Sequence, residues 1–397
     1  MTPHKRIPGH RFLHSPGPTR VPDEVMDAMR RQPMDLADPR LDVVIQACEN
    51  GLKALLQTRD ADVFMYACNG HGAWEAVIAN LLAPGQQVLI AGTGHFSESW
   101  AIQTEAMGAN VIRTPWREGY PIDVAAIEAA LRADTAHAIV AVFVVHTDTA
   151  SGMTSDPARI RQVLDAAAHP ALLVVDVVAS LGAAPFAMDA VGANVVLGAS
   201  QKGLMVPPGL AFVAADAAAM KVAAANPTPR FYWDWARRQS PLCYRKFCGT
   251  PPQSLLFGLE AALGLIFHEG VEEVIARHQL IAGAVHAAVD AWSEGGALWL
   301  FVREPAARSV SVTTVSVAAG IDPEALRTIA REQFQVAIAG GLGPLAGRTF
   351  RIGHLGDMNP AMILGCLAGV EAAMRVQGTP IGSGGMQHAV AALAGKR

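Results

Sequence analysis

Short apolar runs rich in β-branched residues recur between residues 86 and 215, and helical patterns lie between them. Each run has few polar positions, as expected of strands that are buried on both faces of a sheet. Strands that alternate with helices usually form a largely parallel sheet that the helices cover. Six strands are predicted in this way, at Gln86–Gly92, Ala109–Thr114, Ala138–His146, Ala171–Asp176, Ala193–Ser200 and Gly209–Ala215.

Four segments around these runs place apolar residues at three- and four-residue spacing, which predicts amphipathic helices. Asp156 followed by Pro157 is a favourable start for one of them, because Asp caps a helix and Pro suits its first turn. The predicted helical segments are residues 74–83, 97–109, 123–133 and 156–168.

The pattern changes near Gly258, where long helical stretches begin and are followed by strand candidates at Ser309–Val317 and Arg348–Leu355. This change indicates a second, smaller α+β domain. We therefore predict an α/β protein with a large domain at residues 21–268 and a small C-terminal domain at 269–397. Residues 1–20, rich in His, Pro and Arg, are predicted to form an arm without its own core.

The charge balance excludes one class of partner. The 397 residues include 31 Lys+Arg and 35 Asp+Glu, for a net charge of −4, and only 17% of residues are charged. Binding to nucleic acid relies on clustered basic side chains, and the sequence has no such cluster. Nucleic acid is therefore not an expected partner.

The cysteines and the apolar stretches bear on location. The five cysteines are widely spaced, with no C-x-x-C pair and no zinc-ligand spacing, so we expect a reducing cytoplasm and no metal. The first twenty residues lack the apolar region of a secretory signal. The longest uncharged stretch, Ala76–Ser97, is interrupted by a turn at Pro84, so no membrane span is predicted.

Two charged residues stand alone at the ends of predicted buried strands. Lys202 is the only charged residue between Asp189 and Asp216, and Asp176 ends the strand Ala171–Asp176. Apolar surroundings lower the pKa of a lysine, whose neutral amine can form a Schiff base. The simpler interpretations are a lysine that reaches out of a loop and a helix-capping aspartate. Together the pair suits pyridoxal phosphate (PLP), whose aldehyde a lysine binds and whose pyridine nitrogen an aspartate keeps protonated.

A phosphate site is suggested by the Gly-rich segment that precedes the helix at 74–83. Asn69, Gly70, His71, Gly72 and Ala73 would present backbone N–H groups at a helix N-terminus, where the helix dipole favours an anion. A simple helix cap explains the segment equally well.

Six separated segments resemble the class V aminotransferases, specifically the serine/alanine–glyoxylate aminotransferase family. In chain order they are PGPTRVPDEVMDAM, GHGAWEAVIANLLAPGQQVL, HTDTASG, LLVVDVVASLG, GASQKGLMVPPGLAF and FRIGHLGDMN, and the resemblance extends from about Pro16 to Val370. It implies the PLP-dependent transferase fold of type I, with a mostly parallel sheet in the large domain.

The resemblance also implies roles for individual residues around the cofactor. Lys202 corresponds to the Schiff-base lysine, and Asp176 to the partner of the pyridine nitrogen. Thr149 corresponds to the residue whose hydroxyl bonds the phenolic oxygen. The phosphate group is matched by Asn69, Gly70, His71 and Gln201.

Two further residues match family positions near the substrate. Phe96 falls where the family places an aromatic ring over the cofactor, although core packing is the simpler interpretation of a phenylalanine. Arg351 matches the arginine that binds the substrate carboxylate, a role that suits a bidentate guanidinium. Without the resemblance it would be read as a surface charge.

One more residue matches the family pattern, and two positions, Phe247 and Arg20, depart from it. Thr250 matches a threonine that binds the phosphate in the partner subunit's site, which implies a homodimer. Phe247 stands where the family has a tyrosine that also donates to the phosphate, so one hydrogen bond is missing. Arg20 replaces an asparagine common in relatives, which changes the charge beside the substrate.

The leading hypothesis is a PLP-dependent aminotransferase that moves an amino group from serine, alanine or aspartate to glyoxylate by a ping-pong mechanism. Phe247 motivates an alternative, a pyridoxamine–pyruvate aminotransferase acting on unphosphorylated pyridoxamine. A cysteine desulfurase would need an exposed thiol loop, and no cysteine is so placed. Gly92 and Gly94 suggest a dinucleotide-binding oxidoreductase, but the sequence lacks the third glycine and the acidic residue of that motif. A non-catalytic protein would not need both Lys202 and Asp176.

Overall fold

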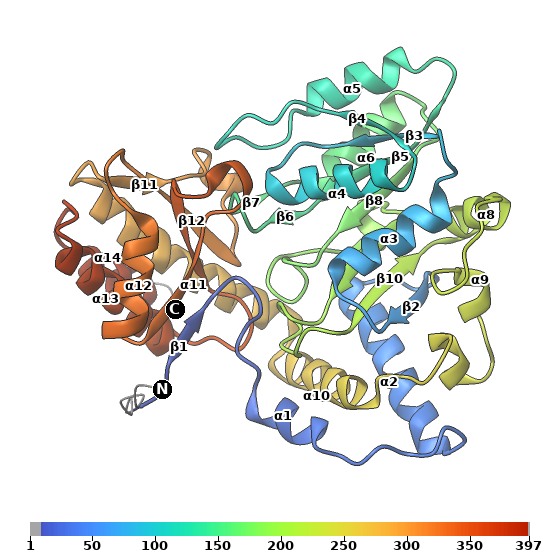
Figure 1. The fold of residues 1–397 in the computed structure, drawn as a ribbon, viewed down its shortest axis with the longest axis horizontal. Helices are drawn as coiled ribbons and strands as arrows, with labels where there is room; N and C mark the ends of the chain where they lie inside the picture. Colours follow the sequence, from blue (N-terminus) through green and yellow to red (C-terminus); the bar gives the residue numbers. More distant parts are fainter. Residues whose placement is uncertain (1–8, 396–397) are drawn as a thin grey trace, which may run out of the picture.

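Two β-sheets, each packed against helices, organise the chain in a computed structural model that describes residues 9–395 (Figure 1). The larger sheet has seven strands in the order β2-β10-β9-β8-β5-β3-β4, and the smaller has five in the order β1-β13-β14-β12-β11. Strands β6 (Thr147–Asp148) and β7 (Met153–Thr154) form a separate two-stranded ribbon.

The larger sheet contains all six predicted strands. Strands β9, β8, β5, β3 and β4 pair in parallel, whereas β10 runs antiparallel to both of its neighbours, β2 and β9. The edge strand β2 of this sheet is not among the predicted strands. The seven strands are β2 (Asp62–Tyr66), β3 (Gln87–Ile90), β4 (Asn110–Arg113), β5 (Ile139–Val145), β8 (Leu172–Asp176), β9 (Val195–Ala199) and β10 (Ala211–Ala215).

The two faces of this sheet belong to two separate apolar cores. Along β5, Val142 and Val144 face one core, and Phe143 and Val145 face the other, as the alternation of side chains in a strand requires. The helices of this part of the chain are α1 (Asp23–Met29), α2 (Pro39–Leu56), α3 (Gly70–Leu81), α4 (His95–Ala106), α5 (Val124–Ala133), α6 (Pro157–Ala166), α7 (Met188–Val191), α8 (Ala217–Ala225), α9 (Trp235–Arg238) and α10 (Gln253–Glu269).

The four predicted helices correspond to α3, α4, α5 and α6. The predicted start at Asp156 is confirmed, because its side chain accepts a hydrogen bond from the backbone N–H of Ala158, with Pro157 in the first turn. The α/β fold with a mostly parallel sheet is therefore confirmed.

The smaller sheet lies beside the larger one in the ribbon and gathers strands from both ends of the sequence (Figure 1). Part of the predicted arm, Phe12–His14, is strand β1 and pairs in parallel with β13. Residues 1–8 of that arm lie outside the described residues, and the predicted domain boundaries stay predictions. The remaining strands are β11 (Leu298–Leu300), β12 (Val312–Val317), β13 (Val336–Gly340) and β14 (Thr349–Gly353), and the helices are α11 (Val271–Ser293), α12 (Pro323–Gln333), α13 (Pro360–Gln377) and α14 (Gly385–Ala394).

Within residues 9–395, no single helix has the length and apolar character needed to cross a membrane. Taken together, α10 and α11 would meet that test, but they are bent by 83° at their junction.

Candidate active site

A cavity of about 270 Å³ lies at the carboxyl ends of β5, β8 and β9. This is the edge at which open α/β sheets bind ligands. All the predicted site residues except Thr250 and Arg351 line it. The lining residues from that prediction are Asn69, Gly70, His71, Phe96, Thr149, Asp176, Gln201 and Lys202.

Lys202 is half-buried in the turn that follows β9. Its Nζ donates to the carbonyl of Pro16, and the backbone of the N-terminal segment is fixed against the same turn, because the Thr19 hydroxyl donates to the Lys202 carbonyl at 3.0 Å. Gly17 allows this contact, since any side chain there would collide with the lysine. Burial lowers the pKa of Lys202 to about 8, and Arg351 acts in the same direction. A neutral, nucleophilic amine is therefore accessible near pH 7–8.

Asp176 ends β8 and is buried. One carboxylate oxygen, Oδ1, accepts from the backbone N–H of Val178 at 2.7 Å, and Oδ2 accepts from the indole Nε1 of Trp74 at 2.7 Å. Burial raises the pKa of Asp176 to about 6, and these two hydrogen bonds oppose the rise. The carboxylate is therefore mostly ionised at pH 7.

The predicted phosphate turn forms the start of α3. Asn69 caps the helix, and its Oδ1 accepts from the backbone N–H of Gly72 at 3.3 Å. Beside it, Oε1 of Gln201 is buried and has no hydrogen-bond partner within residues 9–395. The helix N-terminus suits an anion. The free amide oxygen of Gln201 is an acceptor, so it suits an anion that carries a proton or a water bound beside it.

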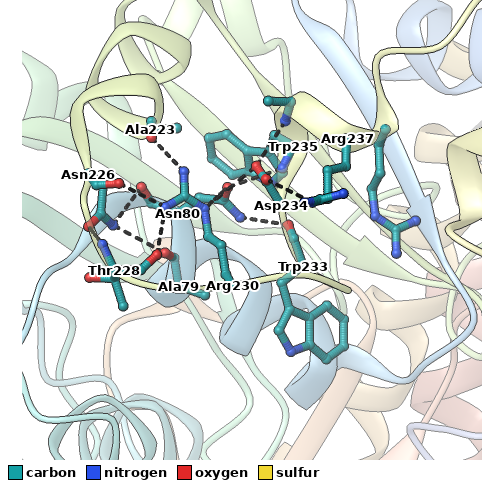
Figure 2. Close-up of polar contacts among 12 residues, drawn as sticks. Ala79, Asn80, Ala223, Asn226, Thr228, Arg230, Trp233, Asp234, Trp235 and Arg237 are labelled. Atoms are coloured by element: carbon teal, nitrogen blue, oxygen red, sulfur yellow. Dashed lines mark hydrogen bonds and ion pairs between the residues drawn. The ribbon is translucent and has the colours of Figure 1, made fainter.

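The far end of α3 is tied to the segment 226–238 by a buried polar network (Figure 2). The Asn80 amide donates to the carbonyl of Trp233 at 2.8 Å, and its Oδ1 accepts from Nε of Arg230 at 3.0 Å and the backbone N–H of Trp235 at 3.2 Å. Asn226 donates to backbone carbonyls at the end of the helix. These bonds satisfy carbonyls that a helix end leaves free.

Trp233 carries this attachment back to the phosphate turn. Its Nε1 donates to Glu75 in α3 at 3.1 Å, and its ring lies so close to Gly72 that a Cβ there would be 3.2 Å from it. The segment 226–238 therefore supports both ends of the helix that presents the turn.

Asp148 is a site residue that the sequence analysis missed. It is buried, and its Oδ2 accepts from the backbone N–H of Phe96 at 2.9 Å while its Oδ1 accepts from that of Ala150 at 2.9 Å. It thereby fixes Phe96 relative to the loop that carries Thr149. Its isolation after a buried strand, the signal that identified Asp176, could have found it.

Arg351 lies on β14 and is buried, so its interpretation as a surface charge is wrong. Its Nε donates to the carbonyl of Gly340 at 2.6 Å, and its Nη1 donates to that of Thr149 at 2.9 Å. Burial lowers the pKa of Arg351 to about 10. The second hydrogen bond joins the small sheet to the loop beside the cavity.

The structure places three other predicted residues away from the cavity. Thr250 is exposed, and Phe247 is buried in the apolar core. Arg20 pairs with Asp357 at 2.5 Å and does not line the cavity. The Phe247 ring therefore faces core side chains within its own chain.

Residues 11–344 match the sequence profile of the family described as Aminotransferase class-V. The chain is 40% identical over 373 residues to an L-aspartate–glyoxylate aminotransferase of Paracoccus denitrificans, covering 93% of each chain. It is 36% identical to a serine–glyoxylate aminotransferase of Methylorubrum extorquens, covering 96% of this chain and 94% of the relative. A pyridoxamine–pyruvate aminotransferase structure from Mesorhizobium loti has a TM-score of 0.89 at 27% identity, covering 98% of this chain and 100% of that one.

Enzymes of this family depend on PLP, and the cavity residues fit that cofactor. A lysine with a lowered pKa can bind its aldehyde, an ionised aspartate can pair with its protonated ring nitrogen, and a helix N-terminus can receive its phosphate. The agreement of cavity chemistry, fold and relatives over nearly the whole chain shows that this protein belongs to the class V aminotransferases and is a PLP-dependent transaminase.

Proposed function

We propose that the enzyme transfers the amino group of serine, alanine or aspartate to glyoxylate by a ping-pong mechanism. The observation that carries the proposal is the placement of buried Arg351 against the Thr149 loop, beside a cavity that contains Lys202 and Asp176. An arginine there can bind the carboxylate that all these substrates share. The relatives named for aspartate and serine, both with glyoxylate, support this substrate class.

Each residue has a role set by its surroundings. Lys202 would hold the cofactor and move the proton of the donor's α-carbon, because its lowered pKa leaves part of the amine neutral. Asp176 would pair with the ring nitrogen. The bound cofactor supplies a ring that accepts electrons. Asp148 would keep Phe96 in place at the cavity wall.

We also propose that the enzyme is a homodimer in which Thr250 completes the partner's phosphate site. Two observations support this. Thr250 is exposed and does not line the cavity of its own chain, and the segment that leads to it exposes two large apolar side chains, Phe231 (64% exposed) and Leu242 (44%). A second copy of the chain would cover such side chains.

The test is the visible absorbance of the purified enzyme with each amino donor and no acceptor. One of L-serine, L-alanine and L-aspartate is expected to remove the band of the bound cofactor in its aldehyde form, and glyoxylate is expected to restore it. An enzyme whose band no donor changes would contradict the proposal.

A second candidate, pyridoxamine–pyruvate transfer, is supported by the similarity to a structure of that name. Phe247, which motivated this alternative, is buried in the apolar core of its own chain and does not line the cavity. The phosphate turn at Asn69 favours the first candidate. Pyridoxamine and pyruvate as the only substrates distinguish the two, since turnover of that mixture is expected only from the second.

A further inference from the structure

Asp176 receives a side-chain hydrogen bond from Trp74, in the first turns of α3. The Nε1–Oδ2 distance is 2.7 Å, and both side chains are almost fully buried. The other carboxylate oxygen accepts from the Val178 backbone at the same distance. With one protein donor on each oxygen, the orientation of the carboxylate is fixed.

The indole of Trp74 is itself held by aromatic contacts. It stacks on Trp100 with ring centroids 5.4 Å apart and an angle of 9° between the planes, and Trp100 stacks on Phe143 at 4.4 Å. The Trp74 ring also lies against the His71 ring, with centroids 4.6 Å apart, and makes an edge contact with the Phe96 ring at a centroid distance of 6.4 Å. The direction of its N–H therefore depends on a rigid stack that extends into the core.

We propose that Trp74 is a positioning residue for the cofactor: its indole N–H keeps the Asp176 carboxylate ionised and correctly oriented to pair with the ring nitrogen of PLP. This inference rests on the PLP dependence of the family. It does not depend on which amino donor the enzyme uses.

Two charged groups lie close enough to Asp176 to influence its pKa. Asp148 disfavours its ionised form, and Lys202 favours it. A hydrogen bond donated to a carboxylate stabilises the ionised form, so loss of the Trp74 donor would raise the pKa of Asp176 further. A neutral carboxyl group cannot hold the pyridine nitrogen in its protonated state. The cofactor would then bind less tightly near neutral pH.

The chain offers a matched control in Trp100. This residue is fully buried in the same stack, but its Nε1 has no hydrogen-bond partner within residues 9–395. Trp74→Phe and Trp100→Phe therefore remove the same atoms from neighbouring rings, and only the first removes a hydrogen bond to Asp176.

The experiment is a titration of each apoenzyme with PLP between pH 5 and 8, without substrate. Hydrogen bonds to charged groups contribute about 1.5–3 kcal/mol, or roughly one to two pKa units, so Trp74→Phe is expected to weaken PLP affinity at least about twofold at pH 7 and about tenfold at pH 5, and Trp100→Phe by less than about twofold at either pH. The wild-type affinity is expected to rise with pH through the Asp176 transition near 6. In Trp74→Phe the midpoint should move up by about one pH unit.

An unchanged midpoint in Trp74→Phe, or equal losses in the two variants, would overturn the proposal. Site-specific incorporation of benzothienylalanine at position 74 keeps the ring size and replaces only the N–H, so it tests the hydrogen bond even where Trp74→Phe does not fold. A wild-type midpoint with that residue would also overturn it. Because the titration contains no amino donor, its outcome is separate from the choice of substrates proposed above.

Discussion

The Asn80 network and the Lys202 cavity both contain buried polar groups, but the hydrogen bonding of these groups differs between the two regions. In the network, the Arg230 guanidinium donates to the carbonyls of Ala223, Asn226 and Thr228 in addition to Asn80, so its donors are widely used (Figure 2). In the cavity, Nζ of Lys202 has one neutral partner, and the buried amide oxygen of Gln201 has none within the described part of the chain.

The difference separates two uses of buried polarity. A densely bonded network fixes the position of its backbone and leaves few groups free for chemistry. Poorly solvated charges cost stability, and burial moves their pKa values toward neutrality, as it does for Asp176 (to about 6) and Lys202 (to about 8). Loss of a cavity residue should therefore affect activity most, and loss of a network residue should affect stability most.

Lys202→Ala should have the largest effect. We expect turnover to fall by at least about 10²–10⁴-fold, the range for a lost general base, and the covalently held cofactor to be lost. The free energy of unfolding should stay equal or rise, because a poorly solvated amine is removed. Steady-state kinetics and chemical denaturation measure both quantities. Lys221→Ala on the exposed face of α8 is the control, and normal transamination by Lys202→Ala would refute the assignment.

Asn80→Ala should have the next largest effect, and on stability. It leaves the Trp235 N–H and one Arg230 donor without their acceptor, at roughly 1–3 kcal/mol for each buried group. We expect the free energy of unfolding to fall by about 2–4 kcal/mol, while the folded fraction keeps its turnover number within about threefold.

The control for Asn80 is Asn110→Ala, which removes an exposed amide that donates to the Gly85 carbonyl. It should change the free energy of unfolding by less than about 0.5 kcal/mol. Equal losses in the two variants, by urea denaturation, would show that the Asn80 network is not a distinct source of stability.

The sequence predicts strands best where burial on both faces removes polar residues. Strand β5 is apolar along its whole length and was easily found. Strand β2 was missed because it begins at Asp62, directly after the charged residues Arg59 and Asp60. The antiparallel direction of β10, and the pairing of β1 with β13, depend on tertiary contacts that no local pattern encodes.

The same limit explains the site residues. Asp176 and Lys202 were found because they stand alone after apolar strands, where a local signal exists. Trp74 was not, since a tryptophan in a helix is usually core, and its contact with Asp176 spans 102 residues of sequence. The role of Arg351 was predicted only through the family resemblance, because an alternating strand pattern does not show whether an arginine is buried.

Phe247→Tyr should have the smallest effect on cofactor binding and would sharpen the same comparison. The Phe247 ring lies in an apolar core and not at the cavity, so a new hydroxyl there has no phosphate to bind within its own chain. We expect PLP affinity to change by less than about twofold and the free energy of unfolding to fall by about 1–3 kcal/mol, the cost of an unpaired buried hydroxyl. Phe231→Tyr on the exposed part of the same segment is the control, and its free energy of unfolding is expected to stay within about 0.5 kcal/mol of wild type.

A clear gain in PLP affinity for Phe247→Tyr, measured by titration of the apoenzyme, would instead place this ring near a phosphate, as the family pattern implies. That outcome would move residue 247 from the apolar core to the active site of the assembled enzyme.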